Sequence, residues 1–228
     1  MHFHQVKLLT YGLFLTNYYG IKLGKVLDSI GKKRLRLEYS QKILAKLNIK
    51  INIENPEKLP DNGQYLILSN HRSIIDPLVI DIALKNTNIF GFWVSKKELY
   101  NSLFFGNAVR NGGAIRIDRK DSKMGTFFSD VKKALNDGNS ICIFPEGTRN
   151  KTPQELLEFK DGFRFIALKN RISILPVYIQ TNTDSALKQG LHNNDKEQEI
   201  TIVIGEILDH RDKNDLETTY RAMFGLGI

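Results

Sequence analysis

Residues 65–85 have the sequence YLILSNHRSIIDPLVIDIALK, a predicted strand followed by a predicted helix. Its first five residues form an apolar run typical of a buried strand, and the residues from Pro77 to Lys85 are expected to form a helix. Beyond this stretch, short β-rich runs continue to alternate with helical segments. Such alternation predicts an α/β fold in which a mostly parallel sheet is flanked by helices.

The expected elements follow from apolar periodicity and turn signals along the chain. Residues 181–199 are polar and rich in Asn, Lys and Gln, so an exposed excursion is expected there. Strands are expected at residues 49–53, 65–69, 89–94, 114–118, 140–144, 172–179 and 200–205. Helices are expected at residues 77–85, 121–136, 162–170 and 212–224.

Composition indicates a globular chain. The 228 residues are 41% hydrophobic and 25% charged, which provides enough apolar material for a core and excludes a disordered or fibrous protein. Cys142 is the single cysteine, so no intramolecular disulfide can form, and a reducing compartment is expected. Because Cys142 lies within an expected strand, a small buried residue is the preferred interpretation. No cleavable secretory signal is visible at the N-terminus.

The positive charge is concentrated at the N-terminus. The whole chain has 33 basic and 25 acidic residues, a net charge of +8, whereas residues 1–50 contain ten Lys or Arg against two acids. The remaining residues balance at 23 against 23, so the entire excess lies in the first segment. We therefore expect two parts: a basic, amphipathic helical arm at residues 1–48 and an α/β domain at residues 49–228.

This arm is predicted to lie on a membrane surface. Its uncharged stretch from Leu8 to Ile21 has 14 residues, fewer than the roughly 20 apolar residues that span a bilayer. The stretch is nevertheless too apolar for a solvated helix, and the basic residues after it suit anionic headgroups. Two alternatives remain: a helix packed on the body with a solvated basic face, and nucleic-acid binding. The second has less weight because no recognisable nucleic-acid-reading element accompanies the charge.

Candidate chemistry follows the ends of three expected strands, where ligands bind in open parallel sheets. The strand at 65–69 leads to His71 and Asp76, and the strand at 114–118 leads to Arg119. The strand at 140–144 leads to the turn Pro145-Glu146-Gly147-Thr148-Arg149. A histidine with an aspartate five residues later can form a general base with its orienting carboxylate. Asp76 followed by Pro77 also suits a helix N-cap, and both interpretations can hold together.

Cationic side chains near these strand ends suit a phosphate. Arg119, Arg149 and Lys160 are the candidates, although each could be an ordinary surface charge. Gly147 could present a backbone N–H to an oxyanion, or form an ordinary turn. The chain lacks a nucleophile elbow, a phosphate-binding loop, a dinucleotide fingerprint and a cluster with metal-ligand spacing. The pattern therefore favours a base and an anion-binding site, with no covalent intermediate and no metal.

Four blocks of sequence then resemble the glycerolipid acyltransferase family, which includes the 1-acyl-glycerol-3-phosphate acyltransferases. Residues 70–76 resemble its NHxxxxD motif, which contains the HX4D pattern. Residues 113–119 (GAIRIDR) resemble the second block, residues 144–149 (FPEGTR) match the third, and residues 175–177 (LPV) resemble the fourth. The blocks occur in the family's order, and the resemblance covers about residues 66–180. Arg116 departs from the pattern, because the family usually has an apolar or aromatic residue there.

The resemblance implies a fold like that of glycerol-3-phosphate acyltransferase and a direct transfer reaction. His71 would deprotonate the free hydroxyl of 1-acyl-sn-glycerol-3-phosphate, and Asp76 would orient His71. The hydroxyl would attack the thioester of acyl-CoA or acyl carrier protein, giving phosphatidate without a further cofactor. The residues implied in binding or shaping the acceptor site are Asn70, Arg119, Glu146, Gly147, Thr148, Arg149, Lys160 and Pro176.

Three further expectations accompany this interpretation. The acceptor could instead be another lysolipid, such as a lyso-ornithine lipid. A different class of function is a non-catalytic, basic protein that binds a membrane or nucleic acid. As an acyltransferase, the protein is expected to be peripheral on the cytoplasmic face of a membrane, with no nucleic-acid partner.

Overall fold

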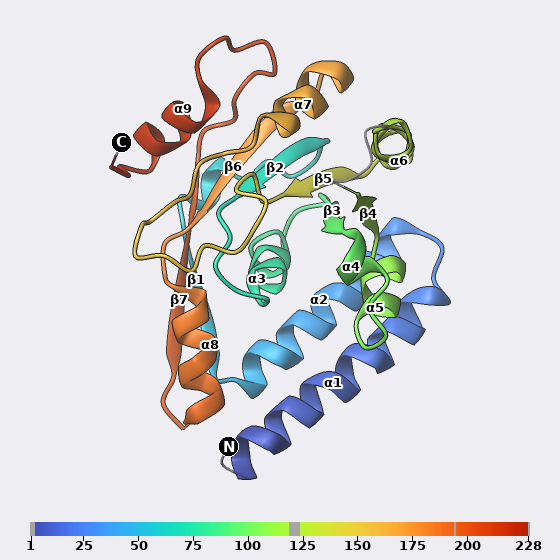
Figure 1. Cartoon of the computed structure of the whole chain (residues 1–228), viewed down its shortest axis with the longest axis vertical. Coiled ribbons are helices and arrows are strands. Elements are labelled where there is room, and N and C mark those ends of the chain that lie inside the picture. The colour runs from blue at the N-terminus through green and yellow to red at the C-terminus, as the bar shows by residue number, and fades with distance from the viewer. Residues whose placement is uncertain (1–2, 119–123, 194, 228) are drawn as a thin grey trace.

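The computed structural model describes residues 3–118, 124–193 and 195–227 of the chain. In this part of the chain, seven strands form one sheet in the order β1-β7-β6-β2-β5-β3-β4, and helices lie on both of its faces (Figure 1). The strands are β1 (Ile49–Glu54), β2 (Tyr65–Ser69), β3 (Gly91–Lys96), β4 (Ala114–Ile117), β5 (Ser140–Ile143), β6 (Ser173–Ile179) and β7 (Gln198–Ile204).

The α-helices are α1 (Phe3–Gly24), α2 (Ser29–Lys46), α3 (Asp76–Ala83), α4 (Lys97–Tyr100), α5 (Gly106–Asn111), α6 (Gly125–Asn136), α7 (Arg164–Asn170), α8 (Thr183–His192) and α9 (Leu216–Met223). Two short 3-10 helices span Pro56–Lys58 and Asp161–Phe163.

The predicted fold class is confirmed. Neighbouring strands are parallel except for β6 and β7, which are antiparallel. All seven expected strands form, with ends that differ from the prediction by at most two residues. The exposed excursion expected at 181–199 contains a helix that was not predicted, because α8 occupies residues 183–192. Asn182 caps that helix by accepting a hydrogen bond from the Ser185 amide, and Ala186 buries its apolar side.

Strand β2 lies at the centre of the sheet and contributes to both faces. Ile67 packs into an apolar cluster with residues of α1, α2, α3 and α8, whereas Leu66 and Leu68 pack into a second cluster with residues of α6, α7 and α9. Cys142 of β5 is 1% exposed, and a Cβ placed on Gly91 would overlap its sulfur. Burial raises the pKa of the Cys142 thiol. Cys142 is therefore a packing residue, as the sequence predicted.

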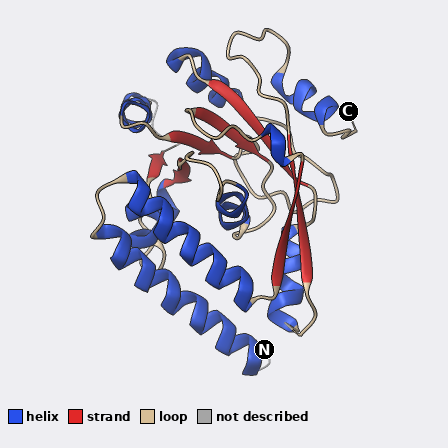
Figure 2. Ribbon diagram, turned by 180° about the vertical axis from the view of Figure 1, so that it is seen from behind, coloured by secondary structure: helices blue, strands red, loops and turns tan. Residues whose placement is uncertain are grey.

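The N-terminal helices share the core of the domain. Tyr19 and Leu23 of α1 are almost completely buried in the same cluster as Ile43 and Leu44 of α2. The carbonyl of Gly20 accepts a hydrogen bond from Asn111 Nδ2 at 2.9 Å, which fixes α1 against α5. Figure 2 shows α1 and α2 side by side along one face of the sheet. The predicted boundary at residue 48 thus separates two segments that are packed together.

Arg36 joins α2 to the rest of the core. Its guanidinium forms a two-point ion pair with Asp81 of α3, and the two side chains are only 9% and 13% exposed. Its Nη1 also donates to the carbonyls of Gly91, at 2.7 Å, and Gly112, at 3.2 Å. The guanidinium carbon lies 4.7 Å from the centre of the Phe90 ring. One charged side chain therefore connects α2, α3, β3 and the turn before β4.

Candidate active site

His71 and Asp76 form a hydrogen-bonded pair at the carboxyl end of β2. His71 lies two residues after the strand, and Asp76 begins α3. The His71 Nδ1 to Asp76 Oδ2 distance is 2.7 Å, and the two side chains are 18% and 0% exposed. Because an ionised carboxylate only accepts hydrogen bonds, Nδ1 carries the hydrogen and Nε2 keeps its lone pair. The imidazole is thus arranged as a proton acceptor.

The Asp76 carboxylate is held by backbone donors as well. Its Oδ2 accepts from the amides of Arg72 and Ser73, both at 2.7 Å, and its Oδ1 accepts from the Thr183 hydroxyl. These bonds fold residues 71–76 into a tight turn around the carboxylate. The alternative role as an N-cap does not occur, because Asp76 is inside α3 and its carboxylate bonds amides that precede the helix. Thr183 lies 107 positions along the chain from Asp76, so no local pattern could reveal it.

The backbone of His71 is fixed by the turn that follows β5. Its amide donates to Glu146 Oε1 at 2.6 Å, and its carbonyl accepts from the Asn150 amide at 2.6 Å. The other oxygen of Glu146 accepts from the Leu157 amide at 2.9 Å. Glu146 is 1% exposed, and this burial raises its pKa to about 7. Glu146 therefore positions His71 from the interior of the protein, whereas the resemblance implied contact with the acceptor.

Aromatic rings pack against the imidazole. The Phe144 ring stacks on His71 with a centroid distance of 3.9 Å and an interplanar angle of 7°. Trp93 of β3 stacks on the other side of Phe144 at 4.8 Å and 20°. Asp76 fixes one edge of the imidazole and Phe144 covers one face, so the direction of Nε2 is set. Sequence analysis assigned no role to Phe144 or Trp93, although β5 was predicted to run beside this site.

The loop after Glu146 carries the exposed polar residues of the site. Gly147 adopts a left-handed conformation (φ 67°) that an L side chain rarely takes, and Thr148 and Arg149 after it are exposed. Lys160 is exposed too, and its amide donates to the Pro145 carbonyl at 2.9 Å. The Asn150–His71 bond connects the backbone of this loop, directly after Thr148 and Arg149, to the backbone of the base.

Arg72 also connects the two turns. Its guanidinium donates to the carbonyls of Thr152, Gln154 and Glu155, at 3.4, 2.6 and 3.1 Å. Asn150 is 3% exposed and organises the same loop, because its side chain bonds the amide and hydroxyl of Thr152 and the carbonyl of Gln154. Neither residue was predicted. The burial of Asn150 and the bonds of Arg72 are visible only in the structure.

Two other predicted residues, Asn70 and Pro176, are buried in the sheet. Asn70 is 2% exposed, and its side chain bonds both the amide and the carbonyl of Ile179, at 2.8 and 3.0 Å. The Asn70 side chain thus links the end of β2 to the end of β6. Pro176 is buried within β6, opposite Leu68, and can shape the site only from within the sheet. Arg119 falls outside the described residues. Arg116, the departure from the family pattern, is exposed on β4.

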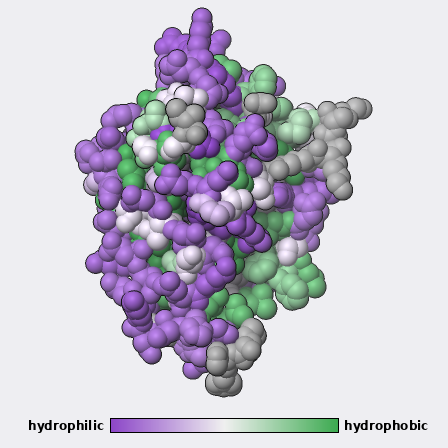
Figure 3. Space-filling model, turned by 60° about the vertical axis from the view of Figure 1, so that its left-hand side comes forward, coloured by the Kyte–Doolittle hydropathy of each residue, from purple (hydrophilic) through white to green (hydrophobic). Residues whose placement is uncertain are grey.

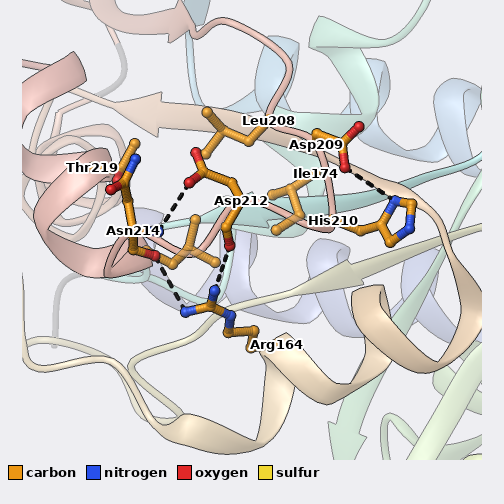
Figure 4. A pocket seen from close by; sticks show the side chains of 9 residues that line it. Arg164, Ile174, Leu208, Asp209, His210, Asp212, Asn214 and Thr219 are labelled. Carbon is orange, nitrogen blue, oxygen red and sulfur yellow. Dashed lines mark hydrogen bonds and ion pairs between the residues drawn. The ribbon is translucent and has the colours of Figure 1, made fainter.

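A shallow hollow lies at the opposite end of the sheet (Figure 4). Arg164 of α7 borders it, with its guanidinium hydrogen-bonded to the carbonyls of Asn214, at 3.2 Å, and Asp212. His210 and Asp209, 3.5 Å apart, form its other side. The hollow has room only for a molecule the size of water. It adjoins Ile174, which pairs with Leu66 near the start of β2, so it is remote from His71.

The chain belongs to the acyltransferase family, whose model matches residues 50–180. A 1-acyl-sn-glycerol-3-phosphate acyltransferase from Helicobacter pylori is 38% identical over 120 residues, which cover 52% of this chain and 49% of that protein. One from Borreliella burgdorferi is 30% identical over 148 residues, 64% of this chain and 57% of that protein. The chain thus spans about half the length of the curated relatives it matches.

A solved structure has the same fold. The crystal structure of the 1-acyl-sn-glycerophosphate (LPA) acyltransferase PlsC from Thermotoga maritima aligns with a TM-score of 0.69 over 97% of this chain and 89% of that chain. The two sequences are 18% identical, so the likeness concerns the fold. The aligned share includes the N-terminal helices, which lie outside the family match at residues 50–180.

Proposed function

We propose that this protein transfers a fatty acyl group from a thioester to the free hydroxyl of 1-acyl-sn-glycerol-3-phosphate, giving phosphatidate. The observation that carries this proposal is the His71–Asp76 pair, 2.7 Å apart and held beside a loop with exposed Thr148 and Arg149. Family membership supports the reaction class. The names of the relatives support the acceptor.

The proposed reaction needs one proton acceptor. His71 Nε2 takes the proton of the acceptor hydroxyl as the oxygen attacks the thioester carbonyl, and Asp76 stabilises the imidazolium that forms. The carbon–sulfur bond then breaks, and the thiolate leaves and recovers the proton from His71. A thiol has a pKa near 8.5, so the thiolate leaves readily. The attacking hydroxyl is therefore the group that needs acid–base assistance.

The acceptor phosphate is proposed to bind the cations of the same sheet edge. Arg149 and Lys160 are the described candidates, with Thr148 as a hydroxyl donor, and Arg119 is retained from the sequence. Gly147 would bring a backbone N–H to the phosphate or to the oxyanion of the tetrahedral intermediate. Both acyl-CoA and acyl carrier protein suit this scheme as donors, and no other cofactor is required.

A lysolipid panel tests the proposal. The purified full-length chain is given lysophosphatidate, a lyso-ornithine lipid and neutral lysolipids, each with acyl-CoA and with acyl carrier protein thioester, and products are identified by mass spectrometry. Lysophosphatidate is expected to react fastest, because its phosphate monoester pairs with the cationic loop. Product formed only from another acceptor would overturn the proposed substrate. Product from none of them would support the non-catalytic alternative.

We further propose that the protein docks on an anionic membrane through α1 and the segments beside it. With the inner face of α1 packed in the core, its outer side exposes Phe14 and Ile21 by 67% and 58%. Leu27 in the turn before α2 is 94% exposed, Ile30 in the first turn of α2 is 83% exposed, and Leu103 before α5 is 86% exposed. In Figure 3 an apolar area stands out at the lower right, at the height of α1 and of the loop before α5 in Figure 1.

Charge and length make this docking peripheral. Residues 1–50 have a net charge of +8, which anionic headgroups attract by about 1 kcal/mol for each nearby basic residue. Among the described residues, no helix combines the length and the apolar character needed to cross a bilayer. Docking at this face keeps the protein where its poorly soluble acyl substrates are found.

Replacing Phe14 and Ile21 together by aspartate is expected to lower binding to anionic vesicles by about 10-fold or more, because each apolar side chain contributes up to about 1.5–3 kcal/mol when buried. Cosedimentation with phosphatidylglycerol vesicles measures the change. Phe165→Asp is the matched control, since Phe165 is 60% exposed on α7, which covers the other face of the sheet. Unchanged binding of the double variant, or an equal loss with the control, would contradict the docking face.

A further inference from the structure

We propose that Thr183 is a positioning residue for the His71–Asp76 pair, an inference that rests on the proposed function. Its hydroxyl donates a hydrogen bond to Asp76 Oδ1, and both side chains are completely buried. The other donors to this carboxylate, including His71 Nδ1, all bond Oδ2. Within the part of the chain that the structure describes, Thr183 is thus the one donor to Oδ1.

The position of Thr183 is set by residues on both sides of it. Asn182 caps α8 through the Ser185 amide at 3.1 Å, so Thr183 is the first residue of a fixed helix end. Four residues before Thr183, the backbone of Ile179 is bonded twice to the Asn70 side chain. Asn70 directly precedes His71. The same buried side-chain amide therefore fixes both the segment that carries the base and the strand end that leads to α8.

The hydroxyl has a defined effect on the base. A carboxylate that accepts a bond at Oδ1 shares its negative charge with that donor, and less remains to stabilise an imidazolium at Oδ2. Removing the Thr183 donor would therefore leave more negative charge on Oδ2, the oxygen that faces the imidazole. Glu146, which bonds the His71 amide and whose pKa burial raises to about 7, and Arg72, whose amide bonds Asp76, are the titratable and charged residues bonded to this turn.

Thr183→Val and Thr183→Ser test this role. Valine keeps the volume and removes the donor, so kcat is expected to fall about 10- to 100-fold with little change in KM. The acid limb of the kcat–pH profile moves to higher pH. Serine keeps the hydroxyl, so it is expected to restore both kcat and the position of the acid limb. NMR titration of the His71 ring in the protein without substrates is expected to differ between the valine variant and wild type, because more negative charge on Asp76 Oδ2 then faces the ring in the variant. Thr16→Val, which removes a buried hydroxyl from α1, is the control and keeps the wild-type profile.

The outcomes separate this inference from the proposed function. A folded valine variant with the wild-type His71 pKa and wild-type kcat would overturn the role of Thr183. If wild type acylates no lysolipid, the proposed function fails, and the NMR comparison still tests the effect of Thr183 on His71. A fall in activity that serine does not restore would mean that Thr183 acts through packing alone, and would also overturn the inference.

Discussion

Replacing His71 by alanine is expected to lower kcat for acyl transfer by about 10²- to 10⁴-fold, the usual contribution of a positioned base. The imidazole is the group that Asp76, Glu146 and Phe144 jointly hold, and alanine leaves the attacking hydroxyl without a proton acceptor. The residual rate should lose the pH dependence that imidazole titration gives the wild type. Initial rates with the preferred lysolipid, measured between pH 5 and 9, provide the comparison.

His210→Ala is the matched control for this substitution. His210 also lies beside a carboxylate, that of Asp209 at 3.5 Å, but at the opposite end of the sheet. Its loss should leave the rate and the pH profile unchanged. Thermal unfolding of both variants checks that they fold. Full activity in a folded His71→Ala protein would be incompatible with the proposed mechanism.

Arg36→Ala is expected to reduce the free energy of unfolding by about 3–5 kcal/mol, because it leaves the buried Asp81 without its cation. The carbonyls of Gly91 and Gly112 lose a donor at the same time. Urea unfolding followed by circular dichroism measures the change. A Lys42→Ala variant is the control, since Lys42 pairs with Glu38 on the exposed side of the same helix at 2.9 Å, and little change is expected there.

The double variant Arg36→Met, Asp81→Leu sharpens this test. Removing both charges avoids the unpaired carboxylate, so part of the lost stability should return. If Arg36→Ala were as stable as wild type, the ion pair would contribute little to holding α2 against the core, and the buried apolar contacts of α1 and α2 would provide that attachment.

Much of this fold and the centre of the site could be predicted from the periodicity of apolar residues and from the spacing of the motif residues. Each strand alternates or runs apolar between clear turn signals, so β2 and its neighbours were predictable, and residues at the ends of parallel strands had to meet. The five-residue spacing from His71 to Asp76 allowed a base with its orienting carboxylate and also a helix N-cap, and the family resemblance favoured the pair. In contrast, α8 was missed because its surface is polar and its few buried residues, such as Ala186, are small.

The direction of side chains was harder to predict. Glu146 and Asn70 belong to motifs that suggest contact with substrate, yet both are buried and bond the backbone of neighbouring turns. A sequence indicates which residues share a turn, and it does not reveal which of them face inward. The contact between Thr183 and Asp76 joins residues 107 positions apart in the sequence, and only the folded chain brings them together.

Because Cys142 is buried, this protein is convenient for site-directed labelling. Cys142 is the single cysteine in the chain, it is 1% exposed, and its raised pKa keeps the sulfur protonated at neutral pH. A cysteine introduced on the surface, for example in place of Leu103, would therefore be the one thiol open to maleimide dyes. An environment-sensitive fluorophore there could report contact with lipid in an otherwise unaltered background.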